Sequence, residues 1–182
     1  MLAVALPHSF RFVIGSAANA HGITRARWSK HIVDEVRGAI LKNRPDLDPR
    51  RIERTMELMS QAVRDALVSG YEELIAGLSL PDPNDRHVLA AAIRCHAQLI
   101  VTSNLDDFPA AELSKYGIEA RDPDSFVVDQ IHLAPARMYQ LITEQAAALG
   151  DPPMTVDDVL DSLARNGLLQ AVALLRAQRE SF

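Results

Sequence analysis

The sequence predicts an α/β fold, a three-layer α/β/α sandwich around a short parallel sheet, followed by a helical appendage. Two observations favour this fold class. Residues 98–102 form a short, continuous run of apolar and mostly branched side chains, which is typical of a strand buried on both faces of a parallel sheet. From Pro135 onward the apolar residues follow helical spacing alone. We therefore predict a sandwich domain over residues 1–132 and a helical extension over residues 133–182.

The elements near the N-terminus are marked by prolines and caps. Residues 1–6 form a candidate first strand that Pro7 ends, and residues 10–20 form a candidate apolar helix. Ser29 is the expected N-cap of a helix over residues 30–42, because apolar side chains recur there at helical spacing.

The next helix is expected to begin at the Asp48-Pro49 pair and to run to about Leu67. Its expected inward positions share one face: Ile52, Met56, Met59, Val63 and Leu67. Its outer face carries four arginines: Arg50, Arg51, Arg54 and Arg64. These arginines form either a solvated face or a surface that contacts RNA or a partner protein.

A proline-rich turn precedes the central helix. Prolines 81 and 83 exclude the residues before them from helical backbone angles, so this helix begins at about Asn84 or Asp85. After the buried strand we expect a short helix over residues 110–115, a brief strand over 118–120 and a helix over 124–131.

The predicted extension contains three helices. The first spans residues 135–149, the second begins at Thr155 and the third spans residues 168–179. Asp158 stands three residues after Thr155, which is a variant of the capping box.

The composition is that of a soluble globular protein. The 182 residues are 48% hydrophobic and 24% charged, and the formal net charge of −5 argues against a nonspecific coat for nucleic acid. The single cysteine, Cys95, cannot form an internal disulfide, which indicates a reducing compartment. No apolar run reaches the length of a membrane span and no secretory signal is visible, so we expect a cytoplasmic protein without a membrane partner.

Polar side chains follow the buried strand at its carboxyl end: Thr102, Ser103, Asn104, Asp106 and Asp107. In open α/β sheets, ligands bind at the carboxyl ends of the strands. The sequence therefore places the candidate site at this edge of the sheet.

Two linked blocks carry a family resemblance. The block that begins Asp85-Arg-His-Val-Leu and the block Leu-Ile-Val-Thr-Ser-Asn-Leu-Asp-Asp-Phe-Pro, which ends at Pro109, resemble the second half of a PIN domain. This is the fold of VapC-type toxin ribonucleases. With the upstream block Trp28–Val36, the resemblance covers roughly residues 8–130. It implies an Mg²⁺-dependent (or Mn²⁺-dependent) endoribonuclease, with RNA as substrate, a cognate antitoxin as partner and a homodimeric assembly.

The resemblance also implies roles for individual residues. Asp85, Glu35 and Asp107 are the expected metal ligands and catalytic acids, and Asn104 supplies an oxygen where many relatives carry a further aspartate. Carboxylates suit this role because Mg²⁺ prefers hard oxygen ligands. Thr102 could position the scissile phosphate or could cap the turn after the strand.

Each of these residues also has an ordinary structural interpretation. Asp85 could simply favour the helix macrodipole, and Glu35 could lie on the helix surface. His87 lies about 200° around the helix from Asp85, so we expect a packed or surface histidine rather than a general base. The histidines show no zinc-ligand spacing with Cys95.

The N-terminal region departs from the family pattern. A PIN domain opens with a strand that ends in aspartate, yet no aspartate occurs before Asp34, and the expected aspartate falls at Met1 or just ahead of it. We therefore expect an incomplete first strand and weak RNA cleavage by the chain as written, which an upstream extension would correct. The alternative function is a degenerate PIN domain that binds RNA or protein without efficient cleavage.

Overall fold

The computed structural model describes residues 2–3, 25–63, 65–149 and 153–179. These residues form two compact units, one that ends at Asp122 and one that begins at Pro123. The predicted helix over residues 10–20 lies outside the described residues.

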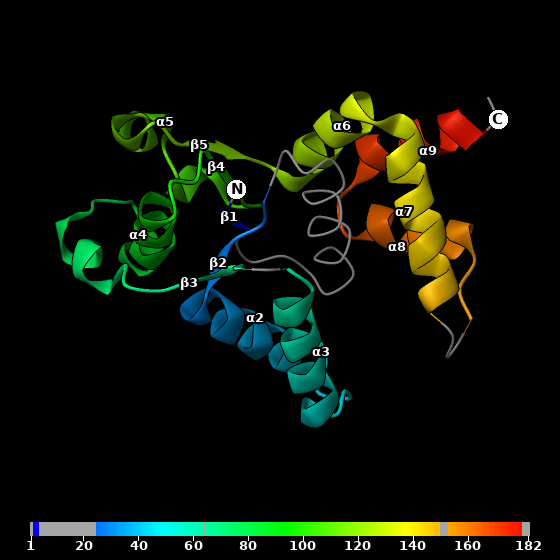
Figure 1. Cartoon of the computed structure of the whole chain (residues 1–182), viewed down its shortest axis with the longest axis horizontal. Helices are drawn as coiled ribbons and strands as arrows, with labels where there is room; N and C mark the ends of the chain where they lie inside the picture. Colours follow the sequence, from blue (N-terminus) through cyan, green and yellow to red (C-terminus); the bar gives the residue numbers. More distant parts are fainter. Residues whose placement is uncertain (1, 4–24, 64, 150–152, 180–182) are drawn as a thin grey trace. The chain divides into compact units, whose positions relative to one another are not determined.

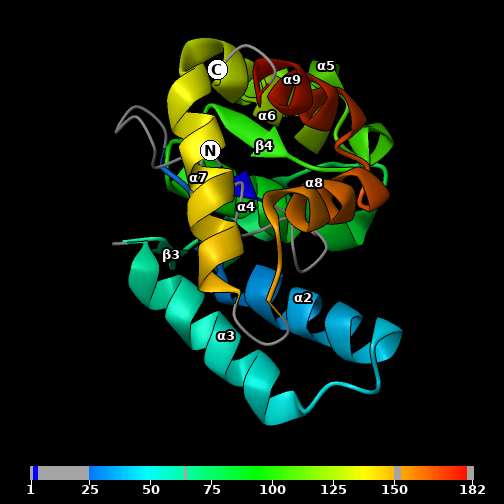
Figure 2. The same cartoon turned by 90° about the vertical axis from the view of Figure 1, so that its right-hand side faces the viewer.

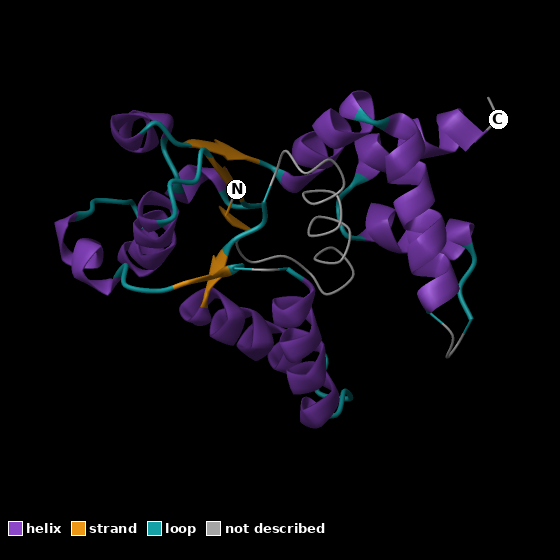
Figure 3. Ribbon diagram, in the orientation of Figure 1, coloured by secondary structure: helices purple, strands orange, loops and turns teal. Residues whose placement is uncertain are grey.

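The first unit contains all the strands of the described residues, and every pairing among them is parallel (Figure 3). One sheet has the order β1-β4-β5 and the other pairs β2 with β3. The strands are β1 (Leu2–Ala3), β2 (Trp28–Ser29), β3 (Leu67–Val68), β4 (Leu99–Val101) and β5 (Glu119–Arg121). The α/β class with parallel strands is therefore observed, whereas the three-layer sandwich stays a prediction.

Strand β4 is the centre of its sheet. Ile100 is in register with Leu2 of β1 on one side and with Ala120 of β5 on the other. Ile100 and Val101 are both completely buried, as the apolar run predicted. Because the three strands are parallel, their carboxyl ends meet at one edge of the sheet. The hydrogen bond from the Thr102 backbone nitrogen to the Arg121 carbonyl, 3.0 Å long, continues the ladder to this edge.

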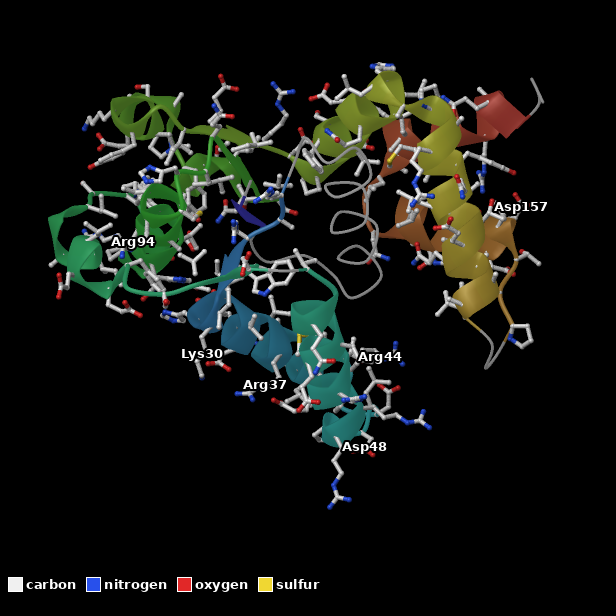
Figure 4. All side chains as sticks on the ribbon, viewed as in Figure 1. Lys30, Arg37, Arg44, Asp48, Arg94 and Asp157 are labelled. Carbon is white, nitrogen blue, oxygen red and sulfur yellow. The ribbon has the colours of Figure 1, made fainter. Side chains whose placement is uncertain are left out.

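Helices α2 (Lys30–Asn43) and α3 (Pro49–Ala62) lie side by side in both views (Figures 1 and 2). The predicted Ser29 cap is present, since its hydroxyl accepts a hydrogen bond from the Ile32 nitrogen at 3.2 Å. Lys30 and Arg37, labelled in Figure 4, form ion pairs with Asp34 at 2.7 and 3.2 Å. Both partners of Asp34 are exposed, so the Asp34 carboxylate lies on the outer side of α2.

The prediction that α3 continues to Leu67 is wrong. The helix ends at Ala62, and Leu67 belongs to β3, where it is 59% exposed rather than turned inward. Ile52, Met56 and Val63 are buried as predicted. The apolar residue Leu67 falls at helical spacing by chance, because it belongs to the extended strand β3, in which Val68 is the buried residue.

Helix α4 (Arg86–Arg94) is the most deeply buried helix of the first unit. Residues 87–92 are all buried, and α4 packs against β1, β2 and the short 3-10 helix η1 (Glu72–Gly77). The turn before α4 forms another 3-10 helix, η2 (Pro83–Asp85). After β4, a third 3-10 helix, η3 (Leu105–Asp107), leads to α5 (Ala110–Leu113) and to η4 (Ser114–Tyr116).

The second unit is helical in its described residues. It contains α6 (Pro123–Leu133), α7 (Pro135–Ala148), α8 (Val156–Arg165) and α9 (Leu169–Arg179). Its core side chains come from all four helices and the turn before α9: Phe126, Val127, Ile131, Met138, Ile142, Val159, Leu160, Leu163, Leu168, Ala171, Val172 and Leu175. The capping box is confirmed, because the Thr155 hydroxyl accepts from the Asp158 nitrogen at 3.1 Å and the Asp158 carboxylate accepts from the Thr155 nitrogen at 2.8 Å.

The boundary between the units lies ten residues before the predicted boundary at 132/133. Helix α6 belongs to the second unit because it packs extensively on α9. The buried carboxylate of Asp124 accepts hydrogen bonds from the backbone nitrogens of Gln170 and Ala171, both 2.9 Å long. Asp124 was predicted only as the first residue of its own helix, but its side chain caps α9.

No helix in the described part of the chain combines the length and the hydropathy needed to cross a membrane.

Candidate metal centre

Three carboxylates converge beside the start of α4. Asp82, Asp85 and Asp107 each offer an oxygen, and these oxygens lie within 4.8 Å of one another. We call these residues the carboxylate trio. All three are partly exposed, so the trio is open to solvent.

The local fold explains how Asp82 and Asp85 come together. The Asp82 carboxylate accepts a hydrogen bond from the Asn84 nitrogen at 2.8 Å, which caps η2. A second bond, from the Asp85 nitrogen to the Asp82 carbonyl at 3.2 Å, closes the turn. The Asp85 carboxylate caps no backbone nitrogen of α4. The helix therefore does not use the Asp85 side chain as a cap, which leaves its oxygens available to a ligand.

Asp107 reaches the trio from the carboxyl end of β4. Its carboxylate accepts a hydrogen bond from the side-chain amide of Asn104. The Asn104 backbone nitrogen in turn donates to the Thr102 hydroxyl at 3.1 Å. Thr102 is only 2% exposed, and its hydroxyl thus caps the turn after β4. A contact of Thr102 with a phosphate stays a prediction, whereas the turn-capping interpretation matches this hydrogen bond.

The carboxylate trio carries unfavourable negative charge. Partial burial raises the pKa of Asp85 to about 6, and the charges of Asp107, Asp82 and Glu35 add to this increase. A hydrogen bond with Asp107 also favours the protonated form of Asp85. A divalent cation would relieve this repulsion, and carboxylate oxygens are the ligands that Mg²⁺ and Mn²⁺ prefer. The residues present therefore fit such an ion.

Glu35 lies outside the trio, although its charge acts on Asp85. Its carboxylate oxygen lies 3.2 Å from Nε2 of His87 and 3.9 Å from Nε2 of His31. The two imidazole rings are stacked, with centroids 3.8 Å apart and planes 20° apart. The structure thus brings Asp85 and Asp107 together directly, and it holds Glu35 in a neighbouring histidine cluster.

His87 is buried, with 2% of its surface exposed, as the packed interpretation predicted. Burial lowers its pKa, and the positive charge of His31 acts in the same direction, whereas Glu35 opposes the change. Its hydrogen bond to Glu35 was not foreseen. The 200° angle between Asp85 and His87 describes their positions around α4 alone. It carries no information about which neighbouring helix contacts His87, and in the structure that helix is α2, through Glu35.

Sequence reasoning did not place Asp82 or His31 beside the predicted site residues, where the structure has them. Asp82 was interpreted only as part of the turn, although it stands three residues before Asp85, a spacing that can place two side chains together. His31 stands four residues before Glu35 and therefore shares its face of α2. Both spacings were visible, but neither identifies a site without the partner segment.

Comparison with known proteins agrees with this geometry. Residues 2–106 match the PIN domain family, and residues 123–177 match the family described as the VapC50 C-terminal domain. A protein of Mycobacterium tuberculosis named "Putative ribonuclease VapC50" is 43% identical over 98 residues. That alignment covers 54% of this chain and 57% of the relative, so the chain spans little more than half the length of the relative it matches. No solved structure matches the chain.

The PIN match covers more than half of the 182 residues, including every member of the carboxylate trio except Asp107, which stands one position beyond it. The second match begins at the residue where the second unit begins. Residues 123–177 are similar to the VapC50 C-terminal domain, and the chain as a whole belongs to the PIN domain family.

Proposed function

We propose that this chain is a metal-dependent endoribonuclease and the toxin component of a toxin-antitoxin system. The observation that carries the proposal is the carboxylate trio, with the pKa of Asp85 raised to about 6, at the carboxyl edge of a parallel sheet. Family membership and the name of the 43% identical relative support the same activity. RNA as substrate, a cognate antitoxin, homodimerisation and a cytoplasmic location are parts of this proposal.

Asp85 and Asp107 are proposed as the direct ligands of Mg²⁺ or Mn²⁺, with Asp82 as a third carboxylate. When bound, the ion supplies positive charge that activates water and stabilises charge on the phosphodiester. Asn104 orients Asp107 through its amide, and Thr102 holds the Asn104 backbone in place. Glu35 adds negative charge next to Asp85 and is the fourth acid of the proposed site.

The decisive experiment is an RNA cleavage assay with and without Mg²⁺. Asp85→Asn and Asp107→Asn should each abolish metal-dependent cleavage, because each removes a charged ligand from the trio. Asp106→Asn is the matched control, since Asp106 is exposed, belongs to the same 3-10 helix and lies outside the trio. Cleavage that survives Asp85→Asn, or that is lost equally in Asp106→Asn, would contradict the assignment.

A second function, RNA or protein binding without efficient cleavage, is favoured by one observation. The chain has no aspartate before Asp34, whereas the family pattern opens with a strand that ends in an aspartate. A site with fewer acids holds its metal and water less firmly. If the chain binds RNA but does not cut it in Mg²⁺ or Mn²⁺, this second function replaces the first.

A further inference from the structure

A second cluster of potential ligands lies next to the carboxylate trio and differs from it in chemistry. It consists of His31 and Glu35 from α2 and of His87 from α4. We call it the histidine cluster. Its three ligand atoms lie within 4.8 Å of one another. The trio offers only carboxylate oxygens, whereas the histidine cluster offers two imidazole nitrogens and one oxygen.

The spacing of these atoms suits a small tetrahedral ion. With zinc–nitrogen and zinc–oxygen bonds of about 2.0–2.2 Å, neighbouring ligands of a tetrahedral site stand roughly 3.3–3.6 Å apart. The Glu35 oxygen lies 3.2 Å from Nε2 of His87 and 3.9 Å from Nε2 of His31. To bind the same ion as His87, the half-exposed ring of His31 must turn out of its stack on His87, because an ion lies in the plane of each imidazole that binds it and the two planes are only 20° apart.

A hydrogen bond between His87 and Glu35 explains part of the geometry but not all of it. The ring of His31 stacks on that of His87, so that both Nε2 atoms approach the same Glu35 oxygen. The hydrogen bond between His87 and Glu35 does not involve His31, so it does not by itself account for the second imidazole beside Glu35.

The cluster also combines a fixed ligand with accessible ones. His87 is 2% exposed, which holds its ring in one orientation. The side chains of His31 and Glu35 are 53% and 43% exposed, so an ion can enter from solvent. Three protein ligands leave one tetrahedral position for water, which is the arrangement of open zinc sites.

We propose that His31, Glu35 and His87 form a binding site for a zinc-class transition metal, separate from the carboxylate trio. Imidazole nitrogen selects zinc, nickel or cobalt over magnesium, whereas the carboxylates of the trio select hard ions. The proposed zinc site shares Glu35 with the proposed nuclease site. Zinc bound here would withdraw Glu35 from Asp85, and that effect on cleavage rests on the proposed function, whereas zinc binding itself does not.

The test is calorimetric titration of the complete, tag-free chain with Zn²⁺, without Mg²⁺ or RNA. Loss of even an outer partner costs metal affinity about 10- to 100-fold, so loss of a direct ligand in His31→Ala should cost at least that much. His132→Ala is the matched control, because His132 is also an exposed helix histidine but lies outside the cluster. It should bind zinc as the parent chain does.

Two further variants separate this proposal from its alternatives. Glu35→Gln should weaken zinc binding as His31→Ala does, and it repeats the test if His31→Ala unfolds in a thermal melt. Asp85→Asn should leave zinc binding unchanged, since Asp85 belongs to the trio. The proposal is overturned if the parent chain does not bind zinc, if His31→Ala and Glu35→Gln bind it as tightly as the parent does, or if Asp85→Asn alone loses it. None of these results depends on RNA cleavage, so failure of the zinc site and failure of the nuclease proposal are distinguishable.

Discussion

The partial burial of Asp85 and the negative charge of Asp107 together hold the pKa of Asp85 at about 6, well above that of an ordinary aspartate. In the metal-free protein the folded state therefore binds more protons than the unfolded state between about pH 4 and pH 6. The free energy of unfolding accordingly falls as the pH rises through this window. Asp85→Asn removes the titrating carboxyl group and therefore this decrease in the free energy of unfolding. The variant should stabilise the metal-free protein at pH 7 by on the order of 1 kcal/mol, allowing for solvent screening.

The measurement is urea unfolding in EDTA at pH 4.5 and at pH 7. The advantage of Asp85→Asn over the parent should be large at pH 7 and small at pH 4.5, while Asp106→Asn should show no such pattern. Added Mg²⁺ should reverse the order at pH 7, because it binds only the folded parent chain with the full set of charges. An advantage that does not change with pH would show that the trio does not repel as described.

Asn104→Asp should lower the stability of the metal-free fold and raise the affinity for Mg²⁺. The substitution removes the amide that donates to Asp107 and places another negative charge beside it. The metal-free melting temperature should fall, and the affinity for Mg²⁺ should rise severalfold, which calorimetric titration would measure. Ser103→Asp controls for general charge, because Ser103 is exposed and adjacent in sequence. Equal gains in Mg²⁺ affinity in both variants would mean that Asn104 has no special place at the site.

Asp124→Ala should destabilise the second unit. It removes both acceptors for the backbone nitrogens at the start of α9, and buried unpaired donors cost about 1–3 kcal/mol each. Circular dichroism should report this loss as an earlier transition of the helices. Trp28, the single tryptophan, is buried in the first unit, so its fluorescence should keep the parent transition. Coincident shifts of both signals would show that the units unfold together.

The observed boundary predicts two different outcomes for shortened chains. A chain that ends at Asp122 should stay folded by Trp28 fluorescence, because it retains both sheets. A chain that ends at Leu133 keeps α6 but lacks α9, which leaves the buried side chains of Phe126, Val127 and Ile131 uncovered. The longer of the two shortened chains should therefore bind a hydrophobic dye and aggregate more readily. The reverse order would place the boundary after α6.

The parts of the fold that could be predicted are those written in local sequence. The Ser29 cap, the Thr155 capping box and the buried strand β4 each depend on residues within a few positions of one another. The end of α3 was missed because nothing local distinguishes Leu67 on a helix from Leu67 on a strand. The second unit begins at Pro123, earlier than the predicted extension, and no local pattern reveals this because the hydrogen bond between Asp124 and the Ala171 nitrogen joins distant segments.

In the candidate site, too, some residues could be identified from local sequence and others depend on how distant segments pack. Asp85 and Asp107 were found because their blocks resemble a known family, and the structure does bring them together. The grouping of Glu35 with His31 and His87 depends on how α2 packs beside α4, which no spacing within either helix reveals. Asp82 was overlooked because its role in the turn was sufficient to explain it.

The link between Asp124 and α9 also bears on the order in which the protein is made. Every residue of the carboxylate trio and of the histidine cluster leaves the ribosome before α9 does, and the last strand of the first unit ends at Arg121. The second unit, in contrast, cannot complete its core until Ala171 has been synthesised. Until then the carboxylate of Asp124 lacks the Ala171 backbone nitrogen that donates a hydrogen bond to it. A growing chain can therefore assemble both sheets of the first unit while the core of the second unit is still incomplete.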